Sequence, residues 1–437
     1  MSRLLVIIVF FGSSSGFGQD SLSLKKAIEI GLQKNFDIQL TQRNMAINQI
    51  MNSWGEAGSL PQININAGQN NSISDQRNNP ISFAPYLFQS NDVSGNLALN
   101  WTLFNGFGIQ ANKSKLEQLQ IQSENTATLA IENTIHGIIL SYYQAKMQRE
   151  QLNLIFNLIQ LSKEKYDQQV LKSNLGVGVK FELLQYENNL LADSSSFYLQ
   201  ELAYRNSIRN LNLLMGESIE KEWILSSEIK PELNDKDFNT LKNEMLANNT
   251  NIKNQFLNIS LNQQDISIAK SSFYPNLILN AGTNTSVGKL QTNDVNAPFP
   301  GASSQNLNYY ANFTLNFRLF NGGKVRRGIK ALEIQNEVNQ IQLEQMQQQL
   351  VLELSNTFAL YQTRKKIFEL NKKAFIASKE NLEIARFKEK TGLINSFNFR
   401  DIEMSYLSSG VNLYQSSFDL LESNATLLKL TGKIIQE

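Results

Sequence analysis

The chain has 437 residues, a length typical of two or three domains, and its 40 Lys and Arg residues balance 39 Asp and Glu residues. This balance leaves no overall basic field, so we expect no nucleic-acid partner. The chain has no cysteine and a single histidine, His136, which excludes disulfides, thiolate metal sites and a cysteine nucleophile. Because no cluster of nucleophilic, basic or metal-ligating side chains appears, we predict no enzymatic activity, no metal site and no cofactor.

Residues 1–18 are predicted to be a secretory signal peptide. Arg3 supplies a positive charge, and Leu4–Phe11 is an apolar run too short to span a bilayer. The small residues Gly16 and Gly18 precede an expected cleavage before Gln19. The mature chain then lies outside the cytoplasm. Beyond residue 20, no stretch approaches the roughly 20 apolar residues of a membrane-spanning helix.

The tetrapeptide Leu-Phe-Asn-Gly occurs twice, at Leu103–Gly106 and at Leu319–Gly322, with a spacing of 216 residues (319 minus 103). Each copy closes an alternating, strand-like segment and opens a very long helical segment. A repeat of this kind predicts one architecture built twice. We therefore expect a first structural repeat over residues 19–216, a linker over 217–236 and a second repeat over 237–437.

Each repeat is predicted to begin with an amphipathic helix and to continue into two strands. In the strands apolar and polar residues alternate, and each strand has about ten residues, the length that crosses a bilayer when tilted. We therefore predict membrane strands; a soluble sheet packed on helices is the alternative. Polar loops between the paired strands are expected on the extracellular surface. The helices are 22–53 and 237–270, the strands about 61–69, 95–104, 275–285 and 309–320, and the loops 69–94 and 286–307.

A proline-free helix of some 60 residues, about 90 to 100 Å long, is predicted after the second strand of each repeat. These helices cover residues 108–173 and 324–390, and each ends at a turn that contains Gly176 or Gly392. A returning helix follows each turn, over 181–214 and 397–430. Helices of this length are typical of coiled coils and bundles.

A sheet of four strands has two open edges, and lipid cannot form hydrogen bonds with the unpaired backbone N–H and C=O groups at these edges. The sheet is therefore expected to close with copies of itself. Two chains give eight strands and a filled interior, whereas three chains give twelve strands and an aqueous lumen. The predicted fold class is therefore mixed α and transmembrane β, internally duplicated. Each chain contributes four strands to a trimeric twelve-stranded barrel that a long α-helical tunnel continues.

Taken in order, these features resemble the TolC-type outer-membrane efflux protein family of Gram-negative bacteria. The resemblance rests on Leu22–Ala27 with Asn35, the strand starts Leu60–Gln62 and Tyr274–Asn276, both Leu-Phe-Asn-Gly copies, Gly176 and Gly392. The family usually has Asp-Gly where this chain has Asn-Gly, and both pairs suit a turn.

The resemblance implies a homotrimer in the cell outer membrane that contacts lipid and extends into the periplasm. It also implies docking to a periplasmic adaptor (membrane fusion) protein and, through it, to an inner-membrane transporter. That transporter supplies the energy, because the chain has no P-loop. The expected function is the exit duct of a tripartite efflux or type I secretion system. The alternative is a periplasmic or surface coiled-coil structural protein, which shares the helices but does not need alternating strands.

Three sets of residues are candidate sites. In the family the tunnel narrows at its periplasmic end near acidic residues, so the corresponding residues here are candidates for a pore aperture. The alternative is that they are solvent-exposed charges at the start of a helix, where acidic residues are favoured. The two turns are candidates for adaptor docking, or they simply reverse the chain. The strand-to-helix joints are expected to place Phe at the lipid interface and Asn-Gly in the bend. The aperture residues are Glu182, Asn398 and Asp401; the docking tips are Leu175, Gly176, Val177, Thr391, Gly392 and Leu393; the joints are Phe104, Asn105, Gly106, Phe320, Asn321 and Gly322.

Overall fold

The computed structural model describes residues 20–231, 233, 235–292, 294, 295, 297 and 300–435. The predicted signal peptide, residues 1–18, lies outside the described residues. The chain divides into two compact units. The first takes in the described residues up to Gln42 together with Ala127–Thr250 and Gln347 onward, and the second takes in Arg43–Thr126 and Asn251–Met346.

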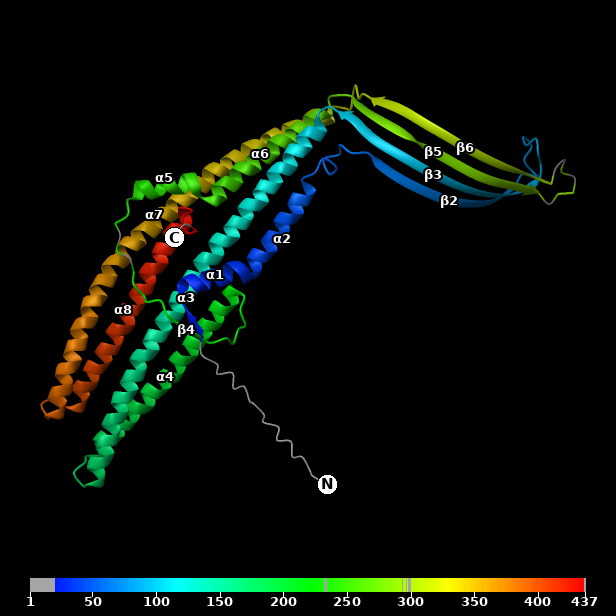
Figure 1. The fold of residues 1–437 in the computed structure, drawn as a ribbon. Coiled ribbons are helices and arrows are strands. Elements are labelled where there is room, and N and C mark those ends of the chain that lie inside the picture. The colour runs from blue at the N-terminus through cyan, green and yellow to red at the C-terminus, as the bar shows by residue number, and fades with distance from the viewer. Residues whose placement is uncertain are drawn as a thin grey trace, which may run out of the picture. The chain divides into compact units, whose positions relative to one another are not determined.

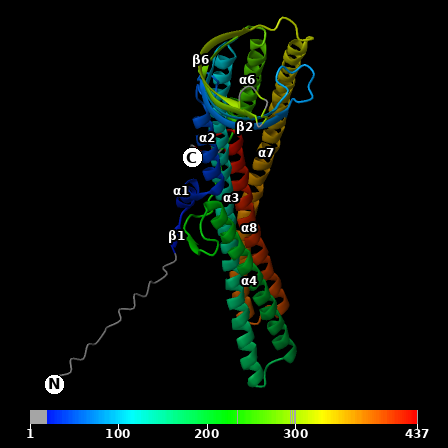
Figure 2. The same cartoon turned by 90° about the vertical axis from the view of Figure 1, so that its right-hand side faces the viewer.

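Two antiparallel helix pairs make up most of the first unit (Figures 1 and 2). The long helix α3 (Gly108–Asn174) pairs with α4 (Lys180–Met215), and α7 (Lys324–Lys390) pairs with α8 (Ser396–Leu430). Both α3 and α7 contain 67 residues, within a residue or so of the predicted bounds. No helix among the described residues is both long enough and apolar enough to cross a membrane.

A short parallel strand pair closes one side of this unit. Strand β1 (Asp20–Leu22) pairs with β4 (Trp223–Leu225), and both cover the buried ring of Tyr142. The Tyr142 hydroxyl donates to the Leu22 carbonyl at 2.8 Å and accepts from the Ser227 amide at 2.9 Å. The segment expected to be only a linker therefore contains a strand. Three residues are too few to show an alternating pattern.

The predictions of one unbroken helix over 22–53 and another over 237–270 are wrong. Asn35 separates α1 (Leu24–Lys34) from α2 (Phe36–Met51), and its side chain accepts the Asp37 amide at 2.9 Å while donating to the Leu214 carbonyl at 2.8 Å. Asn249 likewise separates α5 (Phe238–Asn248) from α6 (Thr250–Ser271), and its side chain donates to the Leu430 carbonyl at 3.0 Å. The Asn35 carboxamide is thus both an N-terminal cap of α2 and a tertiary contact, and each of the two breaks lies where an Asn side chain contacts the end of a returning helix.

A four-stranded antiparallel sheet in the order β2-β3-β5-β6 belongs to the second unit, and Figure 2 shows that it is curved. Its strands are β2 (Gln62–Asp75), β3 (Leu87–Asn105), β5 (Asn276–Thr292) and β6 (Gly301–Asn316). The strands are longer than predicted, and most of the residues expected to form polar loops pair in the ladder. Far from the helices apolar residues are sparse and do not alternate regularly with polar ones, so the sequence pattern weakens although the backbone still pairs.

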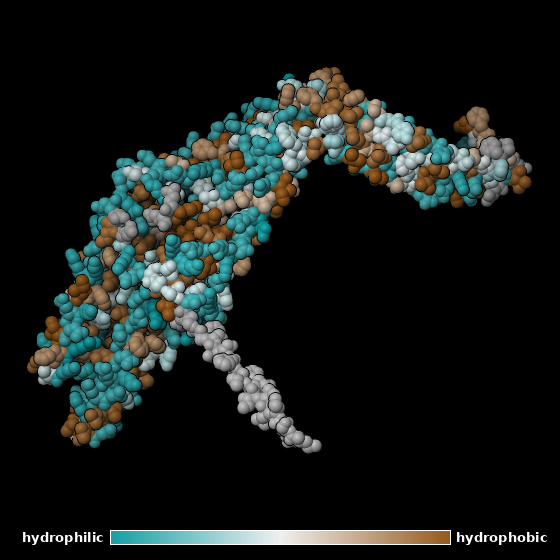
Figure 3. Space-filling view, viewed as in Figure 1, coloured by the Kyte–Doolittle hydropathy of each residue, from teal (hydrophilic) through white to brown (hydrophobic). Residues whose placement is uncertain are grey.

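The register gives the sheet one apolar face and one amide face. Ile63, Leu99 and Ala281 lie in one row across the strands. Three residues further along, on the other face, a row consists of Asn66, Asn96, Asn284 and Asn308. The Asn66 amide donates to Asn96 at 3.4 Å, and Asn96 in turn donates to Asn284. Hydrophobic side chains gather at the end of the sheet nearest the helices (Figure 3).

Candidate functional site

Both tip turns are closed by the same backbone hydrogen bonds. At the end of α3, the Gly176 amide donates to the Ser173 carbonyl and the Val177 amide to the Lys172 carbonyl, each at 3.1 Å. At the end of α7, Gly392 donates to Glu389 at 3.0 Å and Leu393 to Lys388 at 2.8 Å. These are Schellman motifs, which need a left-handed residue after the helix. Gly176 has φ +75° and Gly392 has φ +73°.

The tips expose apolar side chains to solvent. Leu175 and Val177 are 69% and 72% exposed, and Leu393 is 70% exposed. Just beyond the turns, the exposed rings of Phe181 and Phe397 lie 6.0 Å apart between centroids, which brings the starts of α4 and α8 together. Contiguous exposed apolar side chains at a chain reversal are typical of a surface that another protein covers.

The three aperture candidates all lie near the starts of the returning helices, but in different surroundings. Glu182 is half-buried and accepts a hydrogen bond from the Gln169 amide at 2.8 Å. Asn398 and Asp401 are exposed on α8. The backbone amide of Asn398 donates to the side chain of Asn395, the N-cap of α8, at 2.9 Å. No hydrogen bond among the described residues joins the three side chains to one another.

A buried ionic cluster, which was not predicted from the sequence, joins α3, α4, α7 and α8 a few turns from the tips. Arg400 on α8 binds Asp193 on α4 through two hydrogen bonds, and the Ser162 hydroxyl of α3 donates to the same carboxylate at 2.5 Å. Lys165 on α3 pairs with Glu389 on α7. Asp193 and Arg400 are 207 residues apart. The only sequence signal is a pair of charged residues, Asp193 and Lys165, at positions that the helical period assigns to the core.

Glu403 completes this cluster and is the most perturbed acid in it. Burial raises the pKa of the Glu403 carboxyl to about 7, against the opposing effects of Arg400 and Lys165. One carboxyl oxygen of Glu403 is buried without a hydrogen-bond partner. A protonated carboxyl suits such surroundings better than a carboxylate does.

The two strand-to-helix joints differ. At the first, the Asn105 side chain accepts the Ile109 amide at 3.0 Å, and a Cβ added to Gly106 would overlap the Ser271 carbonyl. At the second, Gly322 has open space around it. Both glycines are left-handed, with φ +67° and +62°. A register shift between Thr102 and Phe104 turns Phe104 to the apolar face beside Leu277, and Phe320 is exposed.

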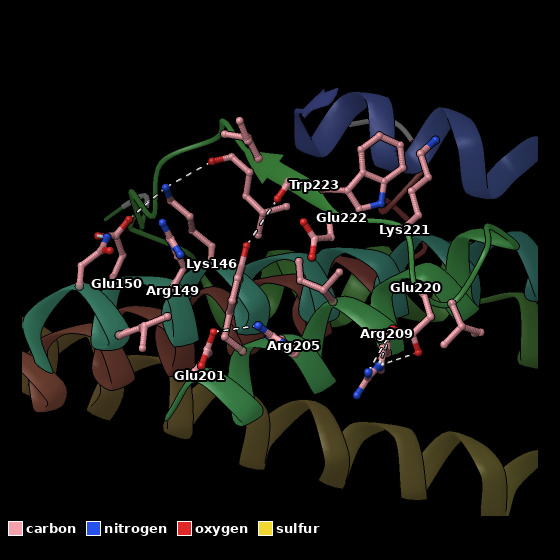
Figure 4. A pocket seen from close by; sticks show the side chains of 17 residues that line it. Lys146, Arg149, Glu150, Glu201, Arg205, Arg209, Glu220, Lys221, Glu222 and Trp223 are labelled. Carbon is pink, nitrogen blue, oxygen red and sulfur yellow. Dashed lines mark hydrogen bonds and ion pairs between the residues drawn. The ribbon is translucent and has the colours of Figure 1, made fainter. Parts of the chain in front are cut away.

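A separate charged pocket of about 440 Å³ lies between α3, α4 and β4 (Figure 4). Arg149 lies over the Tyr204 ring, 5.4 Å from its centroid. The other labelled cations already have partners in the wall, as in the Arg205–Glu201 and Arg209–Glu220 pairs. The sole histidine is elsewhere: His136 contacts the Thr426 hydroxyl at 3.3 Å, and burial lowers its pKa to about 4. Nothing in the pocket arranges a nucleophile beside a base.

Comparison with known proteins identifies the fold. Residues 241–433 match the model of the outer membrane efflux protein family. A membrane protein from Pseudomonas aeruginosa superposes with a TM-score of 0.74 and 16% identity, over 94% of this chain and 93% of that chain. The Campylobacter jejuni CmeC outer membrane channel gives 0.73 and 16%, over 94% and 85%.

The open-state Neisseria gonorrhoeae MtrE outer membrane channel gives a TM-score of 0.68 at 16% identity, over 94% of this chain and 88% of that chain. No curated protein sequence matches the chain. The family match includes Asn249 but not Asn35, and the two side chains make equivalent hydrogen bonds, to the Leu430 and Leu214 carbonyls. Residues 241–433 thus match the outer membrane efflux protein family, and the chain as a whole has the fold of TolC-type outer-membrane channels.

Proposed function

We propose that the chain is one subunit of a homotrimeric exit duct in the outer membrane. In this role, an inner-membrane transporter passes solutes through a periplasmic adaptor into the duct and so to the outside, by tripartite efflux or type I secretion. The duct itself catalyses no reaction. We also propose that residues 1–18 are a removable signal peptide and that 19–216 and 237–437 are duplicated repeats.

One observation carries this proposal: the curved sheet has two edges, β2 and β6, that pair with no other strand in the described chain. Each unpaired backbone group in lipid costs several kcal/mol, so a membrane sheet needs closed edges. Three copies supply twelve strands, which leave an aqueous lumen. The apolar face then meets lipid, and the row of Asn66, Asn96, Asn284 and Asn308 meets water.

Exposed apolar stripes on the helices support self-association. On α4, Leu184, Leu191 and Tyr198 recur every seven residues and are 48%, 62% and 69% exposed. A seven-residue spacing of apolar side chains is typical of a helix that packs against a neighbouring helix. Within one chain this stripe is uncovered, and neighbouring copies in a trimer are its proposed partners.

Purified full-length protein tests the channel assignment. Native mass spectrometry is expected to give a trimer, planar bilayers are expected to show stable conductance, and the protein is expected to fractionate with outer membrane. A monomer recovered from the soluble periplasmic fraction, without conductance, would contradict the proposal and favour a coiled-coil structural protein.

The tips Leu175, Gly176, Val177, Thr391, Gly392 and Leu393 are the proposed adaptor-docking surface. Because the chain lacks cysteine, Val177→Cys and Leu393→Cys place single reactive groups at the tips. We expect both variants to cross-link in cells to a periplasmic adaptor that carries a cysteine in its hairpin. Lys379→Cys, exposed on α7, is the matched control, and equal cross-linking from all three positions would argue against tip docking.

A further inference from the structure

A cationic pocket lies where α6 ends and α7 begins, at the foot of the sheet in the second unit. It is open and has a volume of about 450 Å³. Three cations, one acid and two exposed aromatic side chains line it. The lining residues are Lys270, Phe273, Tyr274, Arg326, Ile329, Lys330 and Glu333.

The positive charge of this pocket is largely uncompensated. Lys270 and Arg326 make no ion pair within the part of the chain that the structure describes, and Lys330 has only a long contact of 3.5 Å to Glu333. The first turn of α7 contains no acidic residue. Arg326 lies in the first turn of α7, where a cation opposes the helix dipole, so Arg326 does not serve to stabilise this helix.

The first repeat provides an internal comparison. At the offsets of 214 and 216 residues that relate the repeats, Glu56, Gln110 and Ser114 stand where the second repeat has Lys270, Arg326 and Lys330. The joint architecture therefore does not require these cations. The first joint has cations of its own, Lys113 and Lys115, but each has a close acidic partner at 2.6 Å, Glu117 and Asp265. The second joint differs in that its cations lack close acidic partners among the described residues, which points to a ligand rather than to folding.

Aromatic side chains place the pocket at the membrane surface. Phe104 lies on the apolar face of the sheet, its ring packs edge-on against Phe107 at 5.3 Å, and Phe107 packs in the same way against Tyr274 at 6.0 Å. Tyr274 also lines the pocket. Aromatic girdles mark the level of lipid headgroups in outer-membrane strands. The apolar residues of β5 and β6 begin directly above, with Leu277 and Leu315 in register.

We propose that Lys270, Arg326 and Lys330 bind the phosphate of an anionic phospholipid headgroup in the periplasmic leaflet, while Phe273 and Tyr274 contact its glycerol and upper acyl chains. In each chain, the bound lipid holds the second joint at a fixed depth in the membrane. Juxtamembrane Lys and Arg residues favour anionic lipid in this way. The proposal rests on the sheet crossing the outer membrane, and it does not depend on adaptor docking.

The test is native mass spectrometry of the full-length channel in detergent, titrated with phosphatidylglycerol or with phosphatidylcholine of the same acyl chains. Wild type is expected to bind phosphatidylglycerol preferentially, at one tight site per chain. The variant Arg326→Gln with Lys330→Ser installs the first-repeat residues. It is expected to weaken phosphatidylglycerol binding about five-fold for each cation removed and to leave phosphatidylcholine unchanged.

Lys372→Gln with Lys373→Ser removes two exposed cations elsewhere on α7 and is the charge-matched control, expected to bind as wild type does. Retention of the oligomer and of conductance shows that each variant is folded. Equal binding of the two lipids to wild type, or equal losses in both variants, would overturn the proposal. So would displacement of phosphatidylglycerol by inorganic phosphate at constant ionic strength, which identifies a free-anion site. Unchanged lipid binding with altered ion selectivity would instead place the pocket in the lumen.

Discussion

Arg400 on α8 holds Asp193 on α4 through two hydrogen bonds, from Nη2 to Oδ1 at 2.6 Å and from Nη1 to Oδ2 at 2.9 Å. Both side chains are largely buried, with 17% and 6% exposed. The pair joins the two returning helices behind the tips. This bidentate interaction needs a planar guanidinium group, so lysine is not an equivalent replacement for Arg400.

Removal of one partner of this pair is expected to destabilise the helical unit. Arg400→Leu leaves a buried, uncompensated carboxylate, and the expected cost is about 3 to 5 kcal/mol in the free energy of unfolding. Arg400→Leu combined with Asp193→Leu is expected to recover much of that loss. Denaturant unfolding followed by circular dichroism measures both. A double variant less stable than the single one would contradict this reasoning.

The free energy of unfolding is expected to fall as pH rises from about 4.5 to about 7, because of Glu403. Its pKa in the folded protein, about 7, lies above the ordinary value of 4.5 for this carboxyl group, so folding takes up a proton between these two pH values. The associated stability is fully present below pH 4.5 and is lost as pH rises through about 7, to a total of about 3 kcal/mol. The facing charges are Arg400, Asp193 and Lys165.

Glu403→Gln is the control for this pH dependence. The amide cannot ionise, so the variant is expected to lose the decrease in unfolding free energy between pH 4.5 and 7, measured by thermal melts at several pH values. The same slope in Glu403→Gln and in wild type would assign the effect to another group.

The left-handed glycines are expected to differ in their tolerance of a side chain. Gly176→Ala meets open space, so only the backbone conformation opposes it, at about 1 to 2 kcal/mol. At Gly216, with φ +69°, an added Cβ would also overlap the Lys34 carbonyl, and we expect about 3 kcal/mol or more. Equal melting-temperature losses in the two variants would contradict the packing argument.

Charge at the proposed aperture is expected to set ion selectivity. Glu182→Ala together with Asp401→Ala removes two carboxylates per chain and is expected to lower cation selectivity in planar bilayers, because rings of acidic side chains attract cations. Asn398→Asp is expected to raise it. Glu29→Ala, an exposed change on α1, is the control. Unchanged reversal potentials in both aperture variants would show that these residues do not line the pore.

The helices were predictable from sequence because a proline-free apolar period persists over some 60 residues, and the tip glycines were predictable because their role is local. The Asn35 bend was not, because the partner that it anchors to, Leu214, is 179 residues away. The Arg400–Asp193 pair was missed for the same reason. The far halves of the strands were not predictable because apolar residues are sparse there and do not alternate regularly. The cations at the second joint stand out only when the two joints are compared.

Helices α3 and α7 contain 67 residues each. The number of residues in each helix therefore sets the distance from its joint to its tip. One inserted residue would advance a tip by about 1.5 Å and rotate it by about 100°. The exposed side chains of that tip would then face a different direction from those of the other tip. We infer that changes of length are tolerated only when α3 and α7, and the helices α4 and α8 that return from them, change together by whole turns.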